Sequence, residues 1–142
     1  MPETFYASSN IAPSIIVQLD SANQFQVTPG NSTSTALYGI SQEGQWTPPG
    51  NSSQTGNILN IDTNAADTNM QLMVYVAGDI CLLQIASNVN AGDYIGSNAT
   101  GFGQTVTPTA NTAATVIAKA LTTSAATTDL VRVKVLSPFS IV

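Results

Sequence analysis

Few residues in this sequence belong to types that carry acid–base or metal chemistry. The 142 residues include no histidine and a single cysteine, Cys81. Histidine is the usual general base and the commonest metal ligand, so Ser-His-Asp and Cys-His arrangements are excluded. The eight acids stand apart along the chain, at Glu3, Asp20, Glu43, Asp62, Asp67, Asp79, Asp93 and Asp129. We therefore predict that the protein is not an enzyme and binds no cofactor; distant acids paired by folding, as in glycoside hydrolysis, are the alternative.

The local contexts of the acids favour structural roles. Asp79 and Asp93 each follow an Ala-Gly dipeptide, which is typical of a tight turn. Residues 62–69 offer side-chain oxygens that suit calcium, but they lack the alternating aspartates and the distal glutamate of a calcium loop. We predict an Asx-rich loop there and no metal site. Cys81 lies between Ile80 and Leu82, which predicts a small buried apolar residue.

Charge is scarce and acidic. Only 8% of the residues are charged, against about 25% in typical soluble domains, and the net charge is −5. The three cations, Lys119, Arg132 and Lys134, form no basic cluster in the sequence, so we expect no nucleic-acid partner. No apolar run approaches the length of about 18 residues that crosses a bilayer, so we expect no membrane contact. The first residues lack a secretory signal, so we expect synthesis in a host cytoplasm.

Hydrophobic alternation predicts an all-β fold. It is strictest over 130–136, where Val131, Val133 and Val135 alternate with Arg132 and Lys134. Segments 14–19 and 24–27 predict a hairpin. Further strands are expected over 36–41, 70–76, 80–85, 94–95, 104–107 and 116–122. The last segment also fits a short helix. Short strands separated by turn residues predict a small β-barrel, β-tulip or sandwich.

A chain of this length fits one domain, which we place at 14–142, after an extended N-terminal arm at 1–13. The arm offers Phe5 and Tyr6 as apolar contacts, and it either lies on a partner or is disordered. Segment 43–53 predicts a long projecting loop, because it joins the only tryptophan, Trp46, to Pro48 and Pro49. Trp46 either covers a small core beneath its loop or anchors an interface. These five residues are the candidate interface.

The order of short motifs resembles that of phage head-decoration proteins, also called cement proteins. An apolar strand with an Ala-Gly-Asp turn, a second Ala-Gly-Asp turn, a glycine-centred hairpin and a terminal Val/Arg strand follow one another. The matching segments are 13–20, 38–44, 71–79, 90–96, Gly101, 116–121 and 130–133. The chain departs from the family at Ala118 and Lys119, where a glycine is expected, and in the long loop around Trp46.

The resemblance implies a viral structural protein of the virion. It implies a β-barrel or β-tulip body, often a homotrimer, that binds the major capsid protein on the outer capsid surface and stabilises the shell. A receptor- or glycan-binding module of a phage tail fibre or spike is the first alternative, since such modules are also rich in β-strand and poor in charge. A surface structural subunit of bacterial origin is the second.

Overall fold

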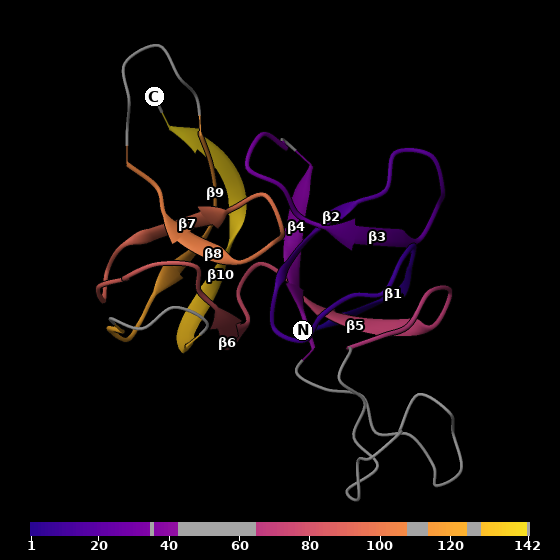
Figure 1. The fold of residues 1–142 in the computed structure, drawn as a ribbon, viewed down its shortest axis with the longest axis horizontal. Coiled ribbons are helices and arrows are strands. Elements are labelled where there is room, and N and C mark those ends of the chain that lie inside the picture. Colours follow the sequence, from indigo (N-terminus) through magenta and orange to yellow (C-terminus); the bar gives the residue numbers. More distant parts are fainter. Residues whose placement is uncertain (35, 43–64, 108–113, 125–128, 142) are drawn as a thin grey trace, which may run out of the picture.

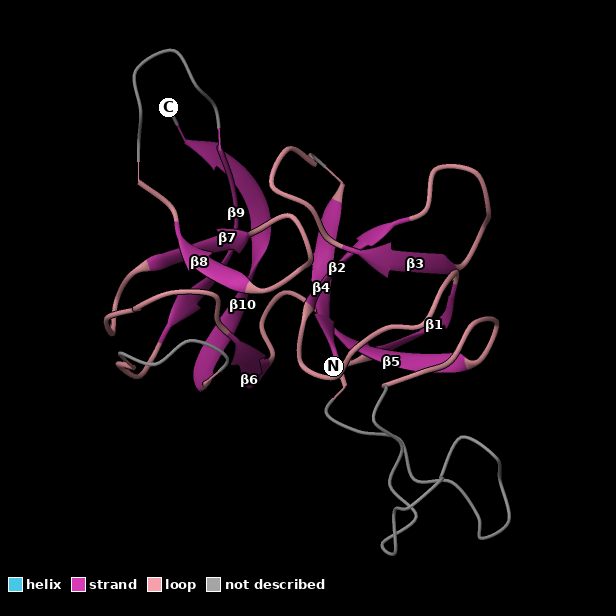
Figure 2. Ribbon diagram, viewed as in Figure 1, coloured by secondary structure: helices cyan, strands magenta, loops and turns pink. Residues whose placement is uncertain are grey.

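The structure, a computed structural model, describes residues 1–34, 36–42, 65–107, 114–124 and 129–141. This part of the chain contains strands and no helix, which confirms the all-β prediction (Figures 1 and 2). It accordingly holds no helix that is long and apolar enough to cross a membrane. The strands are β1 (Glu3–Ala7), β2 (Ile16–Leu19), β3 (Gln26–Pro29), β4 (Leu37–Ser41), β5 (Gln71–Tyr75), β6 (Ile80–Gln84), β7 (Tyr94–Ser97), β8 (Gly103–Thr105), β9 (Ala114–Ala120) and β10 (Leu130–Ile141).

The N-terminal half forms a closed barrel with strand order β1-β3-β2-β4-β5, seen on the right of Figure 1. Strands β2 and β3 form the predicted antiparallel hairpin. Strand β1 closes the barrel, because it pairs in parallel with β3 and antiparallel with β5. Closure leaves the barrel without free strand edges, which would otherwise be sites of unwanted pairing.

The prediction of an extended arm over residues 1–13 is therefore wrong. Residues 3–7 are a barrel strand, and Ile11 forms a further bridge to Ala66. Ala7 and Ile11 are completely buried. The physical reason is the two-residue alternation of β1, which turns Phe5 and Ala7 toward the barrel and leaves the intervening side chains outside.

The C-terminal half forms a second sheet with strand order β6-β10-β9-β7-β8, on the left of Figure 1. Its longest strand, β10, lies between β6 and β9. It runs 12 residues, well past the predicted end at 136, and shifts register between Val135 and Phe139. Residues 116–120 of the ambiguous segment 116–122 lie in strand β9, which confirms a strand there instead of a helix. Pairing with β7 and β10 buries three successive residues from Val116, and the strand ends at Ala120. A parallel bridge between Ile85 and Gly103 joins the two edges of the sheet, so they are partly covered.

One wall joins the two halves. Strand β4 lies between them (Figure 2), and its Leu37 and Ile40 belong to the core under the second sheet, while Tyr38 packs against the barrel core. Main-chain hydrogen bonds cross the same boundary, from Ile16 N–H to the Gly101 carbonyl and from Gln84 N–H to the Ser14 carbonyl, both at 2.8 Å. The shared core and these bonds hold the second sheet at a fixed place beside the barrel.

Candidate interaction surface

Two of the isolated acids, Asp79 and Asp93, support turns. The carboxylate of Asp79 accepts the Val76 N–H at 3.0 Å, and that of Asp93 accepts the Asn90 N–H at 2.9 Å. The glycine before each aspartate has a positive φ, 99° in the first turn and 94° in the second. The N-terminal ammonium of Met1 and the Val76 N–H hold the pKa of the Asp79 carboxyl below its usual value. The turn interpretation of both Ala-Gly-Asp motifs is thus confirmed.

The other described residues that could bind a metal or react also have structural roles. Among the residues that the structure describes, no group of three or more His, Cys, Asp or Glu side chains could hold a metal ion. Cys81 is buried in the core under the second sheet, as predicted. In the segment examined for calcium, residues 62–64 lie outside the described part. In the described part of this segment, residues 65–69, Thr68 donates its N–H to the side chain of Asn10 at 3.0 Å.

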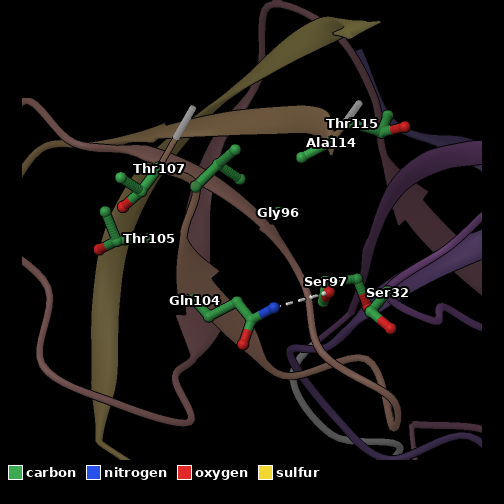
Figure 3. A pocket seen from close by; sticks show the side chains of 9 residues that line it. Ser32, Gly96, Ser97, Gln104, Thr105, Thr107, Ala114 and Thr115 are labelled. Carbon is green, nitrogen blue, oxygen red and sulfur yellow. Dashed lines mark hydrogen bonds between the residues drawn. The ribbon is translucent and has the colours of Figure 1, made fainter. Parts of the chain in front are cut away.

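An open hollow of about 310 Å³ lies where β7, β8 and β9 approach the segment after β3 (Figure 3). Gln104 donates a hydrogen bond from Nε2 to the Ser97 carbonyl at 3.3 Å across one side of it. The described lining residues are Ser32, Gly96, Ser97, Gln104, Thr105, Val106, Thr107, Ala114 and Thr115. None of them is charged or aromatic, so they supply neither an acid–base pair nor an aromatic platform for a sugar ring.

The structure separates the two N-terminal interface candidates. Phe5 packs against the barrel core and meets Tyr38 edge to face, with the ring centroids 5.4 Å apart. Tyr6 lies on the outside of the barrel and is 43% exposed. Phe5 is therefore part of the barrel wall, whereas Tyr6 is free to meet a partner. Trp46, Pro48 and Pro49 lie outside the described residues.

Exposed apolar side chains accompany Tyr6 on the barrel. Tyr6 pairs with residues of both β3 and β5, and its N–H donates to the Phe25 carbonyl at 2.8 Å. Phe25 is 70% exposed. Met70, directly before β5, and Met73, within β5, are about half exposed. We call Tyr6, Phe25, Met70 and Met73 the barrel apolar patch. The sequence indicated Tyr6 alone, because the pairing of β1 with β3 and β5 is not local.

A second surface lies on the outer side of the second sheet. The registers place four exposed residues in one row across β7, β9, β10 and β6: Tyr94, Lys119, Lys134 and Ile80. Arg132 lies two residues before Lys134, on the same side of β10. We call these five residues the basic sheet face. It carries all three cations of the chain.

Aromatic contacts fix the end of this row. Lys119 Nζ lies 5.9 Å from the ring centroid of Tyr94, within the range of a cation–π contact. The Tyr94 ring also meets Phe139 edge to face, at 5.6 Å between centroids. Sequence reasoning missed Tyr94. The signal available was its position directly after the Asp93 turn, but its place beside Lys119 depends on the register of β7 against β9.

No protein-family model and no curated protein matches the sequence. Among solved structures, the chain is similar to the head fiber gp8.5 N base of bacteriophage phi29, with a TM-score of 0.52 and 16% sequence identity. The similarity covers 96% of this chain and 93% of that one. The chain thus shares, over nearly its whole length, the fold of that base.

Proposed function

We propose that the chain is a bacteriophage virion protein that binds the outer surface of the capsid and stabilises the shell, as a decoration protein does. The observation that supports this most is the extent of the fold similarity, because the described barrel and second sheet together correspond to nearly all of a phage head-fibre base. The order of motifs that resembles decoration proteins is a separate line of support. The proposal assigns no catalysis and no cofactor to the chain.

The composition suits such a role. A surface with few charges and many Ser, Thr and Asn side chains can form numerous hydrogen bonds to a partner while desolvating few charges. Many copies on a regular shell reinforce one another, so each contact can be weak. The proposed partners are the major capsid protein and further copies of the chain in a homotrimer.

A second candidate is favoured by the same neighbour. Since that protein is a head fibre base, the chain could instead belong to a fibre or spike and take part in binding a receptor or glycan. The hollow at Gln104 and Ser97 gives this candidate little support, because none of its described lining residues is aromatic.

Co-sedimentation tests the proposal. Purified protein is mixed with capsids of its phage that were prepared without it, and the bound fraction is measured against protein concentration. Light scattering gives the mass of the free protein. Saturable binding to capsids is expected, and light scattering is expected to give the mass of a trimer. A protein that stays in the supernatant at every concentration contradicts the proposal, and a glycan screen then tests the fibre candidate.

A further inference from the structure

We propose that the basic sheet face contacts the shell and that its partner there is an acidic protein surface. This inference rests on the proposed function and adds to it the contact surface and the chemistry of the partner. Its foundation is the placement of charge: a chain with eight acidic and only three basic side chains gathers all three basic side chains on one side of one sheet. Arg132 and Lys134 lie on the same side of β10, and Lys119 lies opposite Lys134.

The described carboxylates do not neutralise this charge. Among the described residues, the ion pair present joins the N-terminal ammonium to Asp79, and none of the three cations pairs with a described carboxylate. Directly opposed like charges on neighbouring strands are destabilising, and Lys119 and Lys134 are such a pair. A local arrangement that opposes stability is typical of a functional surface. A partner that brings carboxylates would relieve the repulsion.

Apolar groups beside the cations add affinity and position. Ile80 is 50% exposed and Tyr94 43%, and both lie in the same row as the lysines. At the β6 edge a hollow of about 300 Å³ is lined by Tyr75, Ile80, Cys81, Leu82 and Arg132. Arginine and tyrosine are enriched at interface hot spots, and arginine binds a carboxylate through two parallel hydrogen bonds. A carboxylate of the partner could therefore meet Arg132 while an apolar side chain enters the hollow.

Two other occupants fit the face less well. A second copy that meets it through the same face would oppose cation to cation, because a two-fold interface brings identical patches together. Nucleic acid is the other occupant to consider. Its affinity grows with the number of phosphates neutralised, and three cations in a chain of net charge −5 neutralise few. An acidic protein surface requires only a few well-placed carboxylates.

The test compares two double variants with the same change in net charge. Lys119→Gln with Lys134→Gln removes two charges from the basic sheet face. Ser21→Glu with Gln24→Glu changes the net charge equally, at exposed positions of the β2–β3 loop. Binding to capsids is measured by co-sedimentation over a salt series. We expect the lysine variant to bind about tenfold more weakly at low salt and to lose most of its salt dependence, while the loop variant stays close to wild type.

The outcomes separate the two proposals. If the wild-type protein does not bind capsids, the proposed function fails, and this inference fails with it. If the wild type binds and the lysine variant binds equally well, the proposed function stands and the contact surface is wrong. Equal losses in both variants would show an effect of net charge instead of position. A third variant, Tyr6→Ser, changes the barrel apolar patch, and a loss of binding in this variant alone would place the contact there. A DNA mobility shift by the wild type that the lysine variant abolishes would identify nucleic acid as the occupant of the basic sheet face.

Discussion

Lys119 of β9 and Lys134 of β10 lie directly opposite each other in the second sheet, both exposed. In a chain with three cations, this register places two of them side by side. Cross-strand neighbours on one face have Cβ atoms about 4.5–5.5 Å apart, so their charges repel. The relationship links the stability of the sheet to its proposed function, because the groups that oppose folding are those offered to an acidic partner.

Replacing one lysine should stabilise the free protein. Lys134→Glu turns the repulsion into an attraction and leaves the contact between Lys119 and Tyr94 in place. We expect a gain of about 0.2–1 kcal/mol in the free energy of unfolding, measured by urea denaturation. Lys134→Gln, which only removes the repulsion, should gain less. High salt should reduce both gains, and a loss of stability in Lys134→Glu would refute the electrostatic account.

Two glycines should differ widely in their tolerance of a methyl group. A Cβ at Gly39 would lie 2.1 Å from the Tyr75 carbonyl oxygen, where β4 pairs with β5, so Gly39→Ala must force the barrel strands apart. A Cβ at Gly78 meets nothing within 4 Å, and only the positive φ of 99° opposes it. We expect a loss of at least about 3 kcal/mol for Gly39→Ala and about 1–2 kcal/mol for Gly78→Ala. Urea denaturation gives both values, and equal losses would contradict the close strand contact.

A buried hydroxyl ties β4 to the segment before β2. Ser41 is completely buried; its Oγ accepts the Ile15 N–H at 3.0 Å and donates to the Ala12 carbonyl at 2.9 Å. Ser41→Ala leaves both backbone groups without this partner, which costs about 1–3 kcal/mol. The exposed Ser9 is the matched control, and its alanine variant should stay within about 0.5 kcal/mol of wild type in thermal or urea unfolding. A Ser41→Ala variant as stable as this control would show that the hydroxyl is dispensable.

Alkaline stability should depend on the barrel pair Tyr38 and Glu3. The Tyr38 hydroxyl donates to the Glu3 carboxylate, and this bond, with burial, raises the pKa of Tyr38 above its usual 10.0. A raised folded-state pKa contributes stability that is fully present below the unfolded pKa and is lost as pH rises through the folded value. We expect urea midpoints to fall less steeply above about pH 10 in Tyr38→Phe, which keeps the ring contact with Phe5. Glu3→Gln should also flatten the profile, and profiles identical to wild type would exclude the coupling.

Local patterning accounted for most strands and for the turns. Alternation identified β10 and the β2–β3 hairpin, and the Ala-Gly-Asp motifs identified two turns, because each signal lies within a few adjacent residues. Local patterning did not predict two features of the fold. Strand β1 pairs with β3 and β5, which are distant in sequence. Strand β10 continues past Pro138, a residue that argues against a strand and that here lies within the register shift between Val135 and Phe139.

The candidate surface was harder to predict than the fold. Alternation alone places Arg132 and Lys134 on one face of a strand, so two of the five residues of the basic sheet face could be predicted from the sequence. The opposition of Lys119 to Lys134, and the place of Tyr94 beside Lys119, depend on registers between strands that are not adjacent in the chain. Residue type drew attention to Phe5, which the fold uses in the barrel wall instead.

The most direct test of capsid attachment is an electron cryomicroscopy reconstruction of capsids incubated with the protein, compared with untreated capsids. The account predicts added density on the outer surface of the shell that fits the barrel and second sheet, with Lys119, Lys134 and Arg132 turned toward the capsid. A shell without added density would contradict it.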